Sequence, residues 1–201
     1  MGTVIIDYGV GNIGSLMGAL DAIQMDYVLS GDLAVIDGAT AIILPGVGAF
    51  AAAMDELKKR HLVDLLKKKA ETGTPILGIC LGMQLLFESS EENGFCEGLG
   101  LIEGNVKAIP ATVKIPHMGW NSLIFNLKDD ILKNNAPDDY VYYVHSYYVN
   151  TVAKNIIASS EYGIQIPGII RQGNILGMQF HPEKSSDVGL NLLKAFKELV
   201  G

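Results

Sequence analysis

A cysteine flanked by closely spaced glycines, in the run GICLG at residues 78–82, constrains this chain more than any other feature. The apolar residues 75–77 before it predict a strand, and residues 83–88 after it predict a helix. Glycines around a reactive residue are typical of a strained strand-to-helix turn, because larger side chains would collide there. Such a turn places Cys80 at a helix start, where the helix dipole favours a thiolate. A cysteine that was only a buried structural residue would need neither glycine.

The first half of the chain alternates short β-rich runs with helical patterns. The expected strands cover residues 3–7, 27–30, 40–44 and 75–79, and the expected helices cover 13–24, 50–71 and 81–91. This alternation predicts an α/β fold with a central, mostly parallel sheet flanked by helices. Glycine-rich corners follow three of the strands, so we expect them to meet at one rim, where ligands of such sheets bind.

The second half is rich in strands that hairpin signals predict to be antiparallel. The expected strands cover residues 101–109, 140–149, 155–159, 168–171 and 175–180. An amphipathic helix over 187–200, capped by Ser185 or Ser186, closes the chain. Without a linker or repeat, the pattern predicts a single domain over residues 1–201.

Composition excludes several classes of protein. A net charge of −7 argues against a nucleic-acid or anionic-membrane surface. The longest apolar run, 41–54, is too short and too interrupted to cross a bilayer, and the first residues lack the charged start of a signal peptide. Two cysteines without a Cys-x-x-Cys pair indicate neither a disulfide framework nor a zinc site. We therefore expect a cytoplasmic protein without a metal or cofactor.

A thiol nucleophile needs a base, and His181 is the best of the four histidines. It follows the apolar strand 175–180 and stands two residues before Glu183, so in extended backbone the two side chains share a face. A carboxylate on one imidazole nitrogen leaves the other free to take a proton from sulfur. His61 lies among charged residues and is expected at the surface.

Acyl transfer also requires hydrogen-bond donors for the oxyanion. The turn offers the backbone N–H of Leu81, and the glycine-containing corner at residues 45–48 offers a second set. Gln84 lies one helical turn beyond Cys80 on the same face, inside an otherwise apolar stretch, so its amide is expected to reach a polar substrate.

Together these residues resemble the class I, triad-type glutamine amidotransferases, and within that class the glutaminase subunits of imidazole glycerol phosphate synthase. The resemblance covers essentially the whole chain and implies the flavodoxin-like α/β fold of that class. The blocks that carry it are DYGVGN at 7–12, LPGVG at 44–48, GICLGMQ at 78–84, PHMGWN at 116–121, VHSY at 144–147 and GMQFHPEKS at 177–185.

The resemblance implies hydrolysis of L-glutamine to glutamate and ammonia through a γ-glutamyl thioester on Cys80, with His181 and Glu183 completing the triad. The other residues that it implies are the oxyanion donors Val47 and Leu81 and the substrate contacts Gly48, Gln84, Ser146 and Tyr147. It also implies that residues 45–48 turn the wrong peptide face to the substrate until a partner binds its nucleotide, so that activity alone is very low.

That partner would be a separate (β/α)8-barrel cyclase, which uses the ammonia to make imidazole glycerol phosphate and aminoimidazole carboxamide ribonucleotide. By the same resemblance, Trp120, Asn121, Tyr142 and Lys184 face this cyclase in a heterodimer. Nothing in the chain has the pattern of a barrel, so the second reaction needs another polypeptide.

Three alternatives remain open at this point. The run GVGNIG at 9–14, with Asp32 further on, matches the fingerprint of an NAD-binding Rossmann domain, although that reading leaves Cys80 and His181 unexplained. The chain could also serve another amidotransferase, or be an inactive binding subunit with the surface around Trp120.

Overall fold

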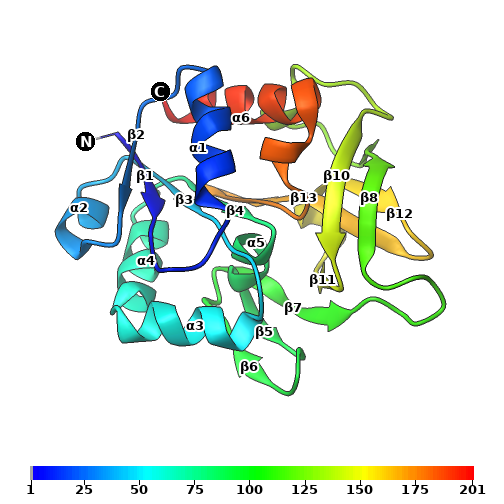
Figure 1. Ribbon diagram of the computed structural model, residues 1–201, viewed down its shortest axis with the longest axis horizontal. Coiled ribbons are helices and arrows are strands. Elements are labelled where there is room, and N and C mark those ends of the chain that lie inside the picture. Colours follow the sequence, from blue (N-terminus) through cyan, green and yellow to red (C-terminus); the bar gives the residue numbers. More distant parts are fainter. Residues whose placement is uncertain (1) are drawn as a thin grey trace.

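An eight-stranded sheet forms the centre of the computed structural model, which describes residues 2–201 (Figure 1). Its strand order is β2-β1-β3-β4-β14-β13-β12-β9. The five parallel strands are β2 (Tyr27–Ser30), β1 (Thr3–Ile6), β3 (Ala41–Leu44), β4 (Ile76–Ile79) and β14 (Ile175–Met178). The antiparallel extension consists of β13 (Gln165–Gln172), β12 (Ile156–Glu161) and β9 (Ile124–Phe125). The expected mostly parallel sheet with antiparallel strands from the second half is confirmed.

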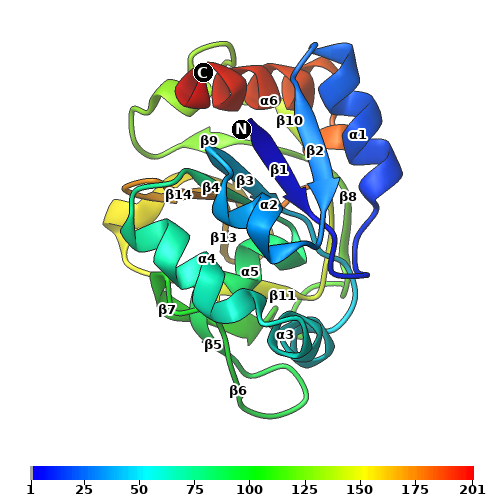
Figure 2. The ribbon, with the colours of Figure 1, turned by 90° about the vertical axis from the view of Figure 1, so that its left-hand side faces the viewer.

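Helices cover both faces of this sheet, because its strands are apolar on both sides (Figure 2). Ile5 of β1 belongs to the core under the first pair of helices, and Val4 to the core under the other four. The first pair is α1 (Ile13–Ala22) and α6 (Ser186–Val200). The other four are α2 (Leu33–Asp37), α3 (Phe50–Lys59), α4 (Leu62–Glu71) and α5 (Leu81–Leu85). Within residues 2–201, none of the helices has the length and apolar character that crossing a membrane requires.

Two smaller sheets stand beside the central one. The antiparallel pair β10 (Tyr140–His145) and β8 (His117–Ser122) forms one of them. The other joins β11 (Tyr147–Asn150), β7 (Ile102–Ala108), β5 (Phe87–Ser90) and β6 (Cys96–Glu97). Short 3-10 turns lie at η1 (Asp130–Leu132), η2 (Ala153–Asn155) and η3 (Pro182–Lys184). Strand β8 was not expected from the sequence.

Three predicted elements have different boundaries in the structure. The helix expected over 50–71 is interrupted at His61, whose left-handed backbone (φ 56°) separates α3 from α4. The helix expected over 81–91 ends after one turn, because Phe87 pairs with the distant strand β7. The strand expected over 140–149 divides at Ser146, and its two halves join different sheets. In the last two cases a tertiary pairing decides the local structure.

The glycine-rich corners meet at one rim of the sheet, as predicted. The Tyr8 hydroxyl, after β1, donates a hydrogen bond of 2.7 Å to the Pro45 carbonyl after β3. A Cβ on Gly46 would lie 2.7 Å from the Gly82 nitrogen, and a Cβ on Gly82 would collide with the Leu44 carbonyl. Only glycine fits where these backbones cross. The corner after β4, which carries Cys80, therefore packs directly against the corner after β3.

Candidate active site

Cys80 occupies a strained position between β4 and α5. Its backbone has φ 55° and ψ −113°, a combination that residues with a side chain rarely adopt. Its N–H donates to the Met178 carbonyl at 2.7 Å, and its carbonyl accepts from the Gln84 N–H at 3.2 Å. A Cβ on Gly78 would lie 2.6 Å from the Gly82 carbonyl oxygen. The strand-to-helix turn expected from the glycine spacing is thus present, and the surrounding backbone holds it.

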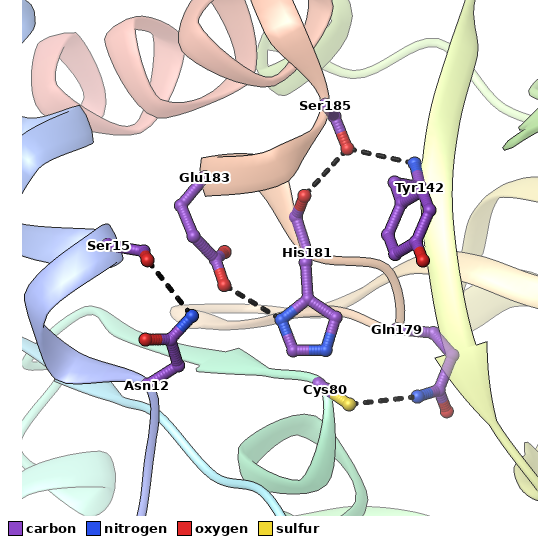
Figure 3. Close-up of polar contacts among 8 residues, drawn as sticks. All are labelled: Asn12, Ser15, Cys80, Tyr142, Gln179, His181, Glu183 and Ser185. Atoms are coloured by element: carbon purple, nitrogen blue, oxygen red, sulfur yellow. Dashed lines mark hydrogen bonds and ion pairs between the residues drawn. The ribbon is translucent and has the colours of Figure 1, made fainter. Parts of the chain in front are cut away.

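His181 and Glu183 form a buried pair next to this cysteine. His181 Nδ1 lies 2.8 Å from Glu183 Oε1, and the two side chains are 4% and 3% exposed. Figure 3 shows the imidazole with Glu183 on its Nδ1 side and Cys80 on the other. Burial lowers the pKa of His181, but hydrogen bonds and charges from Cys80 and Glu183 outweigh it and raise this pKa to about 9. The imidazole therefore carries a proton at neutral pH, which it can give to a leaving group.

Hydrogen bonds to Tyr142 of strand β10 hold both the N–H and the carbonyl of His181, the second through the Ser185 hydroxyl. Its N–H donates to the Tyr142 carbonyl at 3.0 Å. The Ser185 hydroxyl accepts from the Tyr142 N–H at 3.0 Å and donates to the His181 carbonyl at 2.6 Å (Figure 3). Of the two expected cap residues, Ser185 occupies the N-cap position of α6, but its side chain makes no hydrogen bond to the helix. Its hydroxyl holds the loop of the histidine instead.

A cavity of about 390 Å³ opens in front of Cys80 and His181. It is large enough for a small metabolite. The lining residues that the sequence analysis singled out are Val47, Gly48, Cys80, Leu81, Gln84, Ser146, Tyr147 and His181. Glu183 does not line it and lies behind the imidazole, in the place of a group that orients the base. Eight residues from four separate blocks of sequence therefore converge on one cavity.

Sequence reasoning missed Glu92, the one carboxylate among the described residues that line the cavity. Its Oε2 accepts a hydrogen bond of 2.6 Å from the N–H of Phe50, at the start of α3. The residue before Phe50, Ala49, cannot cap this helix with its side chain, and Glu92 supplies the missing acceptor. Since 42 residues separate the two partners, no local sequence pattern could have shown this contact.

The four residues expected to face a partner lie outside the cavity. Trp120 is 53% exposed and packs edge-on against Tyr142, its neighbour across the β8–β10 pair, with ring centroids 5.9 Å apart. Lys184 is exposed on η3. Asn121 lies on the opposite face of β8 from Trp120, where its amide donates to the Glu161 carbonyl at 3.0 Å. The structure thus brings Trp120 and Tyr142 together at the surface but turns Asn121 inward.

Comparison with known families identifies the class of protein that this site belongs to. The sequence matches the family described as "Glutamine amidotransferase class-I" over residues 4–198. The chain belongs to this family. The family resemblance expected from the motifs is thereby confirmed, and the NAD-binding alternative loses its support. In the structure, Asp32 of that alternative accepts the N–H groups of Ala34 and Val35 as the cap of α2.

Curated relatives of this amidotransferase are similar over nearly the whole chain. Imidazole glycerol phosphate synthase subunit HisH of Oceanobacillus iheyensis is 49% identical over 197 residues, which cover 98% of each chain. The protein of the same name from Listeria monocytogenes serotype 4a is 52% identical over 198 residues, covering 98% of this chain and 95% of the relative.

Solved structures agree on the amidotransferase fold. The structure of PurLQS from Thermotoga maritima superposes with a TM-score of 0.76 at 20% identity, over 100% of this chain and 99% of the matched one. A crystal structure described as a glutamine amidotransferase gives a TM-score of 0.74 at 19% identity, over 96% and 98% of the two chains. At such identities the likeness concerns the fold alone.

Proposed function

We propose that this chain is the glutaminase subunit of an imidazole glycerol phosphate synthase and acts as a single domain. The observation that carries the proposal is the convergence of Cys80 and His181 on one cavity, with Glu183 hydrogen-bonded behind the imidazole. Relatives about 50% identical over nearly the whole chain, named as subunits of that synthase, support the choice within the family. The cytoplasmic location expected from the sequence stays a prediction.

The arrangement supports hydrolysis of L-glutamine in two steps. Cys80 Sγ, whose proton is already held by His181, attacks the side-chain amide carbon of glutamine, and the C–N bond breaks as His181 gives that proton to the departing ammonia. Water then attacks the γ-glutamyl thioester, His181 takes its proton, and the sulfur leaves with glutamate as the product. The N–H groups of Val47 and Leu81 stabilise the oxyanion in both steps. Glu183 holds the proton on His181 Nδ1 throughout.

Polar groups around the cavity match the ends of the substrate. The carboxylate of Glu92 and the side-chain oxygen of Gln84 are acceptors for the α-ammonium group of glutamine. Gly48, Ser146 and Tyr147 line the same cavity, and their main-chain N–H groups are the donors for the α-carboxylate. These contacts orient the side-chain amide toward Cys80.

An apolar surface beside the cavity provides the docking site for the cyclase. Trp120 and Tyr142 share one face of the β8–β10 pair with exposed Met118. Val144, on the same face, lines the cavity, so the surface leads to the site where ammonia forms. Exposed aromatic residues of this kind anchor protein interfaces. Lys184 is exposed on η3, and contact of Lys184 and Asn121 with the cyclase stays a prediction.

Ammonia release from L-glutamine tests the proposal. We expect very little activity from the chain alone and strong activity when it is mixed with the cyclase subunit of the same organism, loaded with its nucleotide. Cys80→Ala should abolish the activity, and Cys96→Ala, at the other free cysteine, should leave it unchanged. A verified complex without any activity would refute the proposal and favour a subunit that only binds. Equal activity with and without the loaded cyclase would refute the dependence on the partner.

A further inference from the structure

Two buried histidines take no part in the reaction described above. His117 and His145 face each other across the β8–β10 pair and are 3% and 7% exposed. His117 Nδ1 lies 2.9 Å from His145 Nε2, and His145 Nδ1 lies 2.7 Å from the Tyr147 carbonyl oxygen. At the other end, the amide nitrogen of Asn121 lies 3.2 Å from His117 Nε2. These contacts form one continuous chain from Asn121 to the Tyr147 carbonyl.

The Tyr147 end of the chain dictates where the protons are. A carbonyl oxygen can only accept, so His145 Nδ1 must carry a hydrogen and donate it. In a neutral ring His145 Nε2 is then an acceptor, which requires that His117 Nδ1 carries a hydrogen as well. His117 Nε2 is in turn left as an acceptor and needs a donor.

The hydrogen bonds of Asn121 independently require that His117 Nε2 is an acceptor. The Asn121 amide nitrogen donates to the Glu161 carbonyl at 3.0 Å, and its amide oxygen accepts from the Ser122 N–H at 2.9 Å. These two bonds fix the orientation of the amide, so its nitrogen faces His117 Nε2 as a donor. With the proton of each imidazole on Nδ1, every hydrogen bond from Asn121 to the Tyr147 carbonyl therefore has one donor and one acceptor.

An additional proton on either ring would break this chain, because two N–H groups would then face each other. In agreement, burial lowers the pKa of His117 to about 4 and that of His145 to about 3. The His117 ring is further held between two aromatic rings, with centroid distances of 4.5 Å to Tyr143 and 3.9 Å to Tyr162. Both rings are thus neutral and fixed in place.

The Tyr147 carbonyl connects this chain to the cavity. Besides the hydrogen of His145 it accepts one from Gln84 Nε2 at 3.0 Å, so both of its lone pairs are used. Gln84 Nε2 gives its second hydrogen to Gln179 Oε1, also at 3.0 Å. With both amide hydrogens directed into the protein, Oε1 is the atom that Gln84 offers to a ligand in the cavity.

We propose that His145 and His117 are positioning residues that fix the Tyr147 carbonyl and thereby keep Gln84 turned with its side-chain oxygen toward the ammonium group of glutamine. This role rests on the proposed function, because it concerns the binding of that substrate. Without the hydrogen bond from His145, the Tyr147 carbonyl is no longer held in place for Gln84. The Gln84 amide can then rotate and present its hydrogens to the ammonium group, which weakens binding.

Nitrogen NMR of the wild-type chain tests the direction of the hydrogen bonds without any activity measurement. In two-bond ¹H–¹⁵N spectra at neutral pH we expect Nδ1 to carry the proton in both rings and Nε2 to carry none. His117→Asn and His145→Asn variants assign the signals, and His61 on the surface is the reference. A proton on Nε2 of either ring, or an imidazolium, overturns the proposal.

Kinetics of the complex with the loaded cyclase test the consequence. His145→Leu removes the donor to the Tyr147 carbonyl, and we expect KM for glutamine to rise about fivefold to tenfold, as for loss of one hydrogen bond, with kcat within about twofold. His145→Asn places an amide N–H near the position of Nδ1 and should restore most of the affinity. A purely structural role would lower the stability of both variants without this split between KM and kcat. An unchanged KM in His145→Leu, or no rescue by His145→Asn, overturns the proposal.

The two proposals fail in different ways. If the wild-type complex releases no ammonia, the glutaminase function is refuted, while the NMR spectra still decide the proton positions in the rings. If the wild type is active and the spectra or the His145→Asn rescue fail, only the positioning role is refuted. Should His145→Leu not fold, the spectra of the wild type alone decide.

Discussion

Replacing the carboxylate behind His181 by an amide, Glu183→Gln, changes one interaction. Glu183 Oε1 is 2.8 Å from His181 Nδ1, whereas Oε2 is buried and has no hydrogen-bond partner within residues 2–201. The substitution keeps the size of the side chain and removes its negative charge. Because both side chains are at most 4% exposed, water screens the lost charge very little.

The size of the effect follows from this single bond. A hydrogen bond between charged groups contributes about 1.5–3 kcal/mol, or about 1–2 pKa units at about 1.4 kcal/mol per unit. We therefore expect the pKa of His181 to fall from about 9 to about 7–8 in Glu183→Gln. The neighbouring Cys80, the larger of the two influences that raise it, accounts for the remaining elevation.

The pH dependence of glutaminase kcat/KM in the loaded complex measures this change. The high-pH limb, where His181 loses the proton needed by the leaving ammonia, should move down by about 1–2 units. The matched control is Glu71→Gln, an exposed carboxylate at the end of α4, which should leave the profile unchanged. A high-pH limb at the wild-type position in Glu183→Gln would refute the assignment of Glu183 as the partner of the base.

The same pair makes stability depend on pH. The folded pKa of His181 lies above its ordinary value of 6.5, so the stabilisation is fully present below about pH 6.5 and is lost as the pH rises through about 9. The difference in unfolding free energy between the wild type and Glu183→Gln should therefore shrink over this range. Urea unfolding at a series of pH values measures it, and a difference that stays constant would contradict the argument.

Three further predictions concern other parts of the molecule. Gly82→Ala should destabilise the fold by about 3 kcal/mol in urea unfolding, because its Cβ meets the Leu44 carbonyl, whereas Gly18→Ala in open space on α1 should stabilise it by about 0.5–1 kcal/mol. Because the folded pKa values of His117 and His145 are lowered, the free energy of unfolding should fall as the pH drops below 6.5, by up to about 2.7 kcal/mol per pH unit. His145→Asn should halve this slope, which urea unfolding at a series of acidic pH values measures. Glu92→Gln should raise KM for glutamine about tenfold with little change in kcat, and an unchanged KM would remove Glu92 from the substrate site.

Local sequence signals predicted the parts of the site that depend on neighbouring residues. The glycines around Cys80 predicted its strained turn, because a backbone that another chain segment approaches closely needs glycine there. The two-residue spacing of His181 and Glu183 placed their side chains together for a similar reason, since the geometry of an extended segment repeats every two residues. The order of strands and helices then indicated that these corners share one rim.

The residues missed by the sequence analysis are those whose partners lie far along the chain. Glu92 reaches the start of α3 across 42 residues, and residues 87–90 become a strand only because β7 lies beside them. The sequence by itself determined the central sheet, the strained turn of Cys80 and the His181–Glu183 pair, because each depends on backbone geometry over a few residues. Only the tertiary structure decided the carboxylate in the cavity and the direction of the bonds between His117 and His145. Those features depend on the burial and donor–acceptor requirements of groups that folding alone brings together.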